Sequence, residues 1–244
     1  MADWFASWFN SDEYLQVYKN RDSNDASKLV ELILQNINLE TNATILDLAC
    51  GSGRHSILFA QLGYIVTGID LSENLLSIAK DNSALLNLKI EFIRKDIRKL
   101  KLNSNFNLVL NLFTSFGYFD TDDENFNIFS IAYNHLVENG FFIFDFLNSK
   151  YVINNLVPYS KEIINNKEVI QERRIENNKI LKKILIASDG ITKEFCESVN
   201  LYNSNSLIQN ITERGFKIQS IFGNYSGELF NELNSPRFIA ICKK

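Results

Sequence analysis

The chain has 244 residues, 45% of them hydrophobic and 22% charged, which is typical of a soluble globular protein with one domain or one domain carrying an insertion. A formal net charge of −4 and a pI of about 5.4 argue against a basic surface for a polyanion, so we expect no nucleic-acid partner.

Cysteine and histidine are scarce in this chain. Three cysteines, Cys50, Cys196 and Cys242, lie far apart and form no C-x-x-C pair, which predicts no disulfide framework and favours a reducing cytoplasm. The two histidines, His55 and His135, do not have the spacing of zinc ligands. We therefore expect a mechanism without a metal.

Residues 1–40 are expected to form a helical cap. The opening segment lacks the basic region and unbroken apolar core of a signal peptide, and no run reaches the ~18 apolar residues of a membrane span. One helical face gathers four aromatic side chains, Trp4, Phe5, Trp8 and Phe9. We expect this face to pack on the domain or to close a pocket; a membrane-surface role is the alternative. DASKLVELILQNI (25–37) predicts an amphipathic helix.

Residues 41–150 alternate between strand and helix patterns and are expected to form the core. Near-continuous apolar runs are typical of parallel strands covered on both faces, and they occur at 43–49, 64–70, 88–94, 106–113 and 141–146. Helices are predicted after Gly53, after the N-cap Ser72, and from Asp122 to Asn139-Gly140, which would supply a left-handed end. This order predicts a doubly wound, Rossmann-like α/β sheet.

Residues 151–202 break the alternation. The runs 168–176 and 179–187 flank Asn177-Asn178, and Asp189-Gly190 precedes a third alternating run, so we predict three antiparallel strands. Residues 203–244 then predict a helix that ends at Gly215 and two closing strands. Because no repeat or low-complexity linker interrupts the chain, we interpret residues 1–244 as a single domain with a small antiparallel β insertion.

The segment ILDLACGSGRHS (45–56) predicts a nucleotide pocket. In a dinucleotide fingerprint Gly51 and Gly53 would fit, with Asp70 on the ribose, but Ser56 replaces the last glycine. Asp47 argues against a dinucleotide, because its carboxylate would repel a pyrophosphate bound beside it. An acid here suits a ligand that carries positive charge and no phosphate, as S-adenosylmethionine does with its sulfonium and ammonium groups.

The same segment resembles the first motif of class I S-adenosylmethionine-dependent methyltransferases. Ala49 stands where the family has its first glycine, and we expect a mild effect because alanine needs only a negative φ. The resemblance continues through VTGIDLS, RKDIRKL, NLFTSFGYF (111–119) and SPRFIAICKK, the last resembling the final antiparallel strand of the family. It implies a seven-stranded, mostly parallel sheet, with 41–150 as the cofactor-binding core and 151–202 as a lid.

The resemblance also implies roles for individual residues. Asp70 would hold both ribose hydroxyls, Asp96 the adenine amino group, and Ile97 would lie beside the ring. The segment with Tyr18 and Arg21 would fold over the cofactor, where Arg21 would pair with the carboxylate of the cofactor or else form a surface ion pair. The full set of expected cofactor-binding residues is Tyr18, Arg21, Asp47, Ala49, Cys50, Gly51, Gly53, Asp70, Leu71, Asp96, Ile97, Asn111 and Phe113.

Structural readings of the same residues stay open. Asp70 would then cap the following helix, and Asp96 would be a solvated turn acid. Asp47 would be a structural acid, and His55 a packed or capping residue rather than a base. Their joint occurrence at the ends of successive strands, where sheets of this type bind ligands, favours the functional interpretation.

Methyl transfer is an in-line displacement in which the enzyme aligns donor and acceptor and excludes water. The aromatic side chains of Phe113, Phe116, Tyr118 and Phe119 are candidates for the wall around the methyl group, with core packing as the alternative. Among residues that would touch the acceptor we favour Tyr118, because its ring has a polar end, and Asp145, which is expected near the end of the fifth strand.

The acceptor class follows from what is missing. Asn111 is followed by Leu-Phe-Thr and not by the Pro-Pro-aromatic of enzymes that methylate base amines, and no cysteine lies near that loop. We therefore expect a small-molecule N- or O-acceptor, as in the amino-sugar and glycine N-methyltransferases that the chain resembles. The alternatives are a protein or peptide methyltransferase, a non-catalytic S-adenosylmethionine-binding protein and an NAD(P) oxidoreductase. We expect no membrane partner and a cytoplasmic monomer or homodimer.

Overall fold

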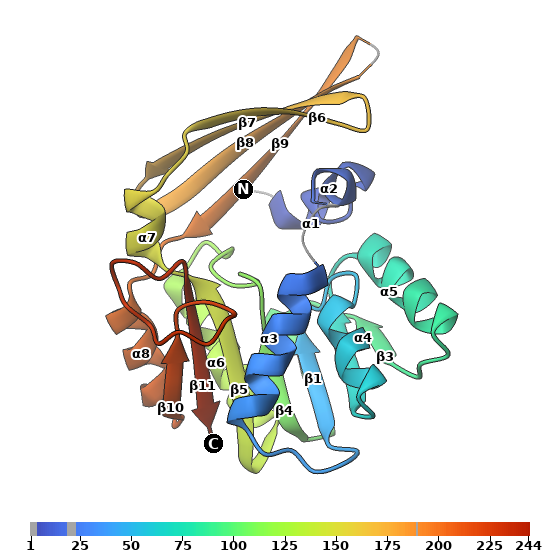
Figure 1. The fold of residues 1–244 in the computed structure, drawn as a ribbon, viewed down its shortest axis with the longest axis vertical. Coiled ribbons are helices and arrows are strands. Elements are labelled where there is room, and N and C mark those ends of the chain that lie inside the picture. The colour runs from blue at the N-terminus through green and yellow to red at the C-terminus, as the bar shows by residue number, and fades with distance from the viewer. Residues whose placement is uncertain (1–3, 19–22, 189) are drawn as a thin grey trace.

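The computed structural model describes residues 4–18, 23–188 and 190–244. Its centre is a seven-stranded sheet (Figure 1), in which β11 (Arg237–Lys243) alone runs antiparallel to the other strands. In spatial order the strands are β10 (Lys217–Phe222), β11 (Arg237–Lys243), β5 (Leu136–Leu147), β4 (Phe106–Asn111), β1 (Thr44–Leu48), β2 (Ile65–Asp70) and β3 (Glu91–Arg94). The predicted α/β fold class is confirmed.

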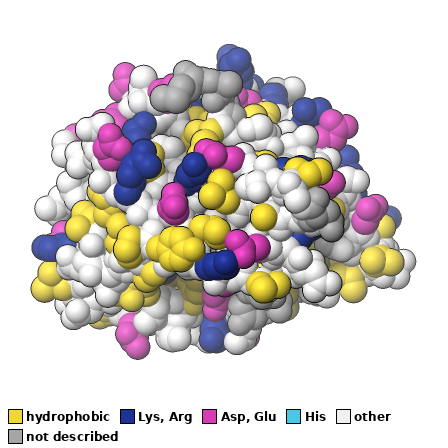
Figure 2. Space-filling model, turned by 90° about the horizontal axis from the view of Figure 1, so that it is seen from above, with side chains coloured by type: hydrophobic (Ala, Val, Ile, Leu, Met, Phe, Trp, Pro, Cys, Tyr) yellow, Lys and Arg dark blue, Asp and Glu magenta, His cyan; other side chains and the backbone are white. Residues whose placement is uncertain are grey.

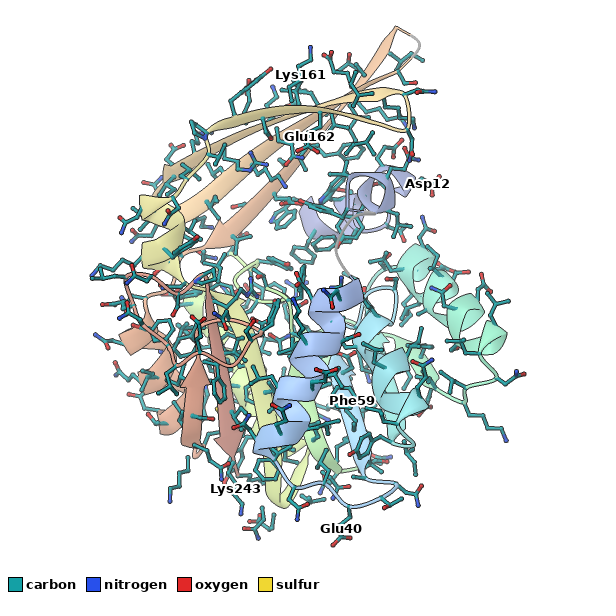
Figure 3. All side chains as sticks on the ribbon, viewed as in Figure 1. Asp12, Glu40, Phe59, Lys161, Glu162 and Lys243 are labelled. Carbon is teal, nitrogen blue, oxygen red and sulfur yellow. The ribbon has the colours of Figure 1, made fainter. Side chains whose placement is uncertain are left out.

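Helices cover both faces of this sheet (Figure 1). They are α3 (Ser23–Asn36), α4 (Arg54–Gln61), α5 (Glu73–Leu85), α6 (Asp122–Asn134) and α8 (Ser204–Glu213), with the short helices η1 (Ile97–Lys99) and α7 (Ser149–Asn154). α3 and α4 pack on one face, where the fully buried Phe59 projects from α4 (Figure 3), and α6 and α8 pack on the other. Ser72 caps α5 as predicted, since its Oγ accepts from the backbone N–H of Leu75 at 3.1 Å.

The predicted end of the helix after Asp122 is wrong. α6 ends at Asn134, and β5 already begins at Leu136. The left-handed Asn139, with φ of 63°, lies inside β5, where the pairing with β4 shifts register. Asn139-Gly140 therefore marks an irregularity of the strand, a position where left-handed backbone is equally suitable.

The insertion is a four-stranded antiparallel sheet and not the three strands that the sequence predicts. The order is β6 (Tyr159–Ile164), β7 (Lys167–Glu176), β8 (Lys179–Ser188) and β9 (Ile191–Asn200), and we call this sheet the lid. β6 escaped prediction because it is an edge strand whose side chains are mostly exposed, so it lacks the apolar alternation of a half-buried strand. Asn177 and Asn178 both have positive φ, as a two-residue hairpin turn requires. Asp189 lies outside the described residues.

The lid rests on two short N-terminal helices, α1 (Trp4–Trp8) and α2 (Asp12–Val17), which we call the cap (Figure 1). The Trp8 ring is 1% exposed, and its centroid lies 4.5 Å from that of Phe195. Its indole N–H donates to Glu197 Oε1 at 2.8 Å. The expected packing of the aromatic N-terminal face is therefore confirmed, and the partner of Trp8 is the lid.

The far end of the lid is fixed to the core. The Asn200 side-chain amide donates to the carbonyl oxygens of Gly117 at 2.8 Å and of Phe119 at 3.0 Å. Gly117 has φ of 82°, and a Cβ there would lie 3.2 Å from the Asn200 oxygen, so the close approach requires glycine. No helix in the described ranges is long and apolar enough to span a membrane.

We predict that Trp8→Ala releases the cap from the lid. Burial of a large aromatic side chain is worth about 3–5 kcal/mol of unfolding free energy, and the lid hairpins contribute little core of their own. Calorimetric melting should show a lower transition for the lid and cap, with the main sheet retained by circular dichroism. Ile163→Ala, at a side chain that is 75% exposed on the lid, is the matched control and should melt like the unaltered protein. Identical melting of Trp8→Ala would contradict this account.

Candidate functional site

A cavity of about 550 Å³ lies where the carboxyl ends of β1, β2 and β4 meet the cap. Most of the residues expected to bind cofactor or acceptor line it, namely Tyr18, Asp47, Ala49, Cys50, Gly51, Asp70, Leu71, Asp96, Ile97, Phe113 and Tyr118. Gly53, Asn111 and Asp145 lie behind the lining, and Arg21 falls outside the described residues.

The loop after β1 is left-handed at three alternate positions. Ala49, Gly51 and Gly53 have φ of 59°, 57° and 76°. The expectation that alanine keeps a negative φ at position 49 is wrong, and an L-residue in this conformation costs about 1–2 kcal/mol. At Gly53 a Cβ would lie 2.9 Å from the Ala79 Cβ and 3.0 Å from the Phe92 ring. Gly53 is therefore needed for packing of the loop on its neighbours.

Asp47 is the most deeply placed acid of the cavity wall. Its side chain is 2% exposed and accepts from Ser56 Oγ at 2.6 Å. Burial raises the pKa of Asp47 to about 7, although the Ser56 hydroxyl and the charge of Arg54 favour the ionised form. The sequence reading treated Ser56 only as a lost glycine and missed this partner. The signal was its position on the first turn of α4, facing the end of β1.

Asp70 connects the loop after β1 to the start of α5. One carboxylate oxygen accepts from the backbone N–H of Gly51 at 2.8 Å and the other from that of Ser72 at 2.8 Å. Burial raises the pKa of Asp70, and these backbone donors oppose the shift. Each oxygen can accept a second hydrogen bond, so the carboxylate can bind a ligand hydroxyl while it holds the loop.

Asp96 caps η1 and pairs with Arg98. Burial alone would raise the pKa of Asp96, but the hydrogen bonds and the charge of Arg98 outweigh it and lower the pKa below its ordinary value. The Arg98 fork donates from Nε at 3.1 Å to Oδ1 and from its NH2 nitrogen at 2.7 Å to Oδ2. Ile97 follows directly on the wall and is buried. The acid is thus fixed in its ionised form.

Aromatic rings from the cap and from the loop after β4 form part of the cavity wall. The Tyr118 ring packs against Trp4, Phe5 and Phe9, with centroid distances of 5.2, 6.2 and 5.6 Å. Phe116, which the sequence left open between wall and core, belongs to the core and stacks on Phe129 at 5.2 Å. Tyr118 is the one predicted acceptor contact that reaches the cavity.

Asp145 does not line the cavity, so the structure does not show the contact with the acceptor that was expected of it. Its carboxylate is fully buried and accepts from Arg237 Nε at 2.8 Å, from the backbone N–H of Phe113 at 3.0 Å and from the Tyr225 hydroxyl at 3.0 Å. With these donors it joins β11 to the loop after β4. Arg237 is far away in the sequence, and no local pattern identified it as the partner.

Asn111 also acts behind the cavity wall. Its side-chain amide donates to the carbonyl oxygens of Ser115 at 3.0 Å and of Leu48 at 3.4 Å. The amide thus joins the loop after β4 to the end of β1. Its predicted contact with the cofactor stays a prediction.

His55 is a buried residue of the cavity wall whose Nε2 has no hydrogen-bond partner among the described residues. Burial lowers the pKa of His55 to about 3, so the ring is neutral and can donate or accept one hydrogen bond. Within residues 4–18, 23–188 and 190–244, no three His, Cys, Asp or Glu side chains gather as metal ligands would. The expected metal-free mechanism stays a prediction.

Comparison with known proteins shows that the chain is similar to methyltransferases. Residues 45–140 match the family model of the methyltransferase domain. A Geobacillus sp. (strain WCH70) protein whose name assigns it to the methyltransferases is 27% identical over 209 residues, which cover 82% of this chain and 84% of that protein. The findings together support a class I S-adenosylmethionine-dependent methyltransferase.

Solved structures of methyltransferases share the fold. An S-adenosylmethionine-dependent methyltransferase from Clostridium acetobutylicum aligns with a TM-score of 0.81 at 21% identity, over 95% of this chain and 98% of that one. An amino pentose methyltransferase from Micromonospora echinaspora, solved with S-adenosylmethionine bound, aligns with a TM-score of 0.68 at 16% identity, over 96% of this chain and 97% of its own. Both cover the lid as well as the core of this methyltransferase.

We predict that Asp47 makes this methyltransferase less stable as the pH rises. Between about pH 4 and about pH 7 the unfolded chain has released a proton that folded Asp47 retains, which costs at most about 4 kcal/mol of unfolding free energy. Asp47→Asn should flatten that loss, as measured by urea unfolding at about pH 5 and about pH 8. Asp81→Asn, exposed on α5, is the control and should keep the loss. An unchanged pH dependence in Asp47→Asn would contradict the buried, raised carboxyl.

Proposed function

We propose that this methyltransferase transfers the methyl group of S-adenosylmethionine to a nitrogen or oxygen atom of a small-molecule acceptor. The observation that carries the proposal is a cavity with acids on the side of the sheet and aromatic rings on the side of the cap. Its volume of about 550 Å³ is in the range of sites that enclose small ligands.

The residues of the cavity fit the cofactor. Left-handed Ala49 and Gly51 give the loop after β1 a concave backbone, and the unpartnered Nε2 of His55 offers a hydrogen bond to a ligand. Asp70 would hold the ribose hydroxyls, Asp96 the adenine amino group, and Asp47 would face the positively charged methionine end. When bound, the cofactor supplies an electrophilic methyl group on a sulfonium.

The chain's own part in the reaction is alignment and exclusion of water. The Tyr118 ring and its aromatic neighbours would seat the acceptor and stabilise positive charge near their faces. Asn165 is the lid residue on the wall among the described residues, so the lid would cover the acceptor chiefly by holding the cap in place. The Tyr118 hydroxyl is the candidate to orient the acceptor.

A small acceptor is supported by two further observations. On the part of the lid side visible in Figure 2, Lys and Arg side chains alternate with Asp and Glu, which does not suit a nucleic-acid backbone. The aligned Micromonospora enzyme is an amino pentose methyltransferase whose chain also spans core and lid. An amine or hydroxyl on a compact metabolite is therefore the favoured acceptor.

We predict that S-adenosylhomocysteine binds in the micromolar range, about −8 kcal/mol, and that Asp70→Asn weakens it. The amide has a single oxygen acceptor and an NH2 donor in place of the second oxygen, and a lost charge-assisted hydrogen bond is worth about 1.5–3 kcal/mol. Titration calorimetry measures both, with NAD as a ligand that should not bind. Glu73→Gln, directly after Ser72, is the control, since the Glu73 side chain is 71% exposed, and it should bind like the unaltered protein. Equal affinity of Asp70→Asn would remove Asp70 from the site.

We predict transfer of radiolabelled methyl groups from S-adenosylmethionine into the low-molecular-weight fraction of a bacterial extract. Tyr118→Ala should lose most of this labelling and keep S-adenosylhomocysteine binding, because the ring lies on the acceptor side. Fractionation of the extract by size, followed by scintillation counting, gives the result. Label in the protein fraction would establish a protein methyltransferase instead, and no label with an intact binding site would establish a non-catalytic binding protein.

A further inference from the structure

The loop after β4 forms one wall of the cavity in a sterically disfavoured conformation. Leu112, Phe113 and Ser115 line the cavity, and Ser115 Oγ donates to the Ala49 carbonyl oxygen at 3.5 Å, so this loop adjoins the loop after β1. Phe113 and Thr114 have φ of 57° and 66°, two successive left-handed residues of which neither is glycine. Such backbone persists only where its surroundings impose it.

The surroundings are the Asp145–Arg237 pair behind the loop. The backbone N–H of Phe113 donates to Asp145 Oδ2 at 3.0 Å, and that of Thr114 to the Asp145 carbonyl oxygen at 3.1 Å. Arg237 donates from Nε to Asp145 Oδ1 at 2.8 Å and from its NH1 nitrogen to Thr114 Oγ1 at 2.9 Å. One guanidinium therefore holds both the carboxylate and the side chain of a left-handed residue.

The fork of Arg237 is suited to this task. Arg237 is the first residue of β11, and its side chain is 18% exposed beside the fully buried carboxylate of Asp145. Charge-assisted hydrogen bonds in such a water-poor place are strong and directional. The Arg237 guanidinium also lies 5.8 Å from the centroid of the Phe113 ring, and the Arg54 guanidinium lies 4.7 Å from the same centroid. Lysine would keep the charge but not the two-directional fork.

We propose that Arg237 is a positioning residue for donor binding: acting through Asp145 and Thr114, it holds the loop after β4 in its left-handed form so that Phe113 closes the cavity. This proposal rests on the proposed function, because it assigns the loop to the donor half of that site. Arg237 itself does not line the cavity. Its effect reaches the ligand only through the backbone at positions 113 and 114.

A role in stability alone makes a different prediction from a role in positioning. If Arg237 only stabilised the fold, changing it would lower the melting temperature without a selective effect on ligand affinity. If it positions the loop, the effect must depend on the residue at 114, because glycine adopts the left-handed conformation without help.

The experiment is a double-mutant cycle read by calorimetric titration with S-adenosylhomocysteine. Arg237→Lys should bind about tenfold more weakly at unchanged secondary structure, the size expected for one lost charge-assisted hydrogen bond. In a Thr114→Gly background, the same change should weaken binding by less than about twofold, because the conformation no longer needs the clamp. Arg174→Lys, exposed on the lid, is the matched control and should bind like the unaltered protein.

Equal losses in the two backgrounds, or full affinity of Arg237→Lys, would overturn the proposal. If Arg237→Lys does not fold, the paired change Asp145→Asn with Arg237→Gln removes both buried charges together and is expected to show the same dependence on residue 114. Failure of the unaltered protein to bind S-adenosylhomocysteine would refute the proposed function itself, and is therefore distinguishable from failure of the loop argument.

Discussion

Carboxylates withdrawn from water at the carboxyl edge of the sheet impose the main constraint on this structure. Asp47, Asp70 and Asp145 are each buried, and each must receive donors from the chain itself. The turn that carries Gly51 and the turn that carries Phe113 direct backbone N–H groups at Asp70 and Asp145, and both turns are left-handed. The need to satisfy these acids shapes both loops that enclose the cavity.

The sequence predicted what depends on local periodicity. Apolar runs identified the strands of the core. The acids at the ends of two of these runs are Asp47 and Asp70, and they were found because the end of an apolar run also marks where the strand reaches the edge of the sheet. It failed where a local rule had two structural solutions. Asn139-Gly140 suits a helix end and a strand irregularity equally, and an alanine at position 49 does not by itself indicate a left-handed backbone. The edge strand β6 is exposed on most sides and has no burial pattern to detect.

Long-range partners were the other limit of prediction. Asp145 was recognisable as an acid near the end of a strand, but its role depends on Arg237, which pairs with it only after β11 has been laid beside β5. The same holds for Glu197 of the lid, which accepts a hydrogen bond from the indole N–H of Trp8, a residue near the start of the sequence. A sequence motif reveals the chemistry of residues within one loop, whereas these contacts form between segments that are distant in the sequence and meet only in the folded chain.

Tyr18 connects the cavity to the lid. Its ring lies on the cavity wall, while its hydroxyl donates to Glu197 of the lid at 2.5 Å and accepts from Lys182. Thermodynamic linkage is reciprocal, so a ligand that stabilises this arrangement of Tyr18 also stabilises the attachment of the lid, and a detached lid lowers the affinity for that ligand by the same factor. Through Tyr18, a ligand in the pocket would therefore strengthen the attachment of the outer sheet.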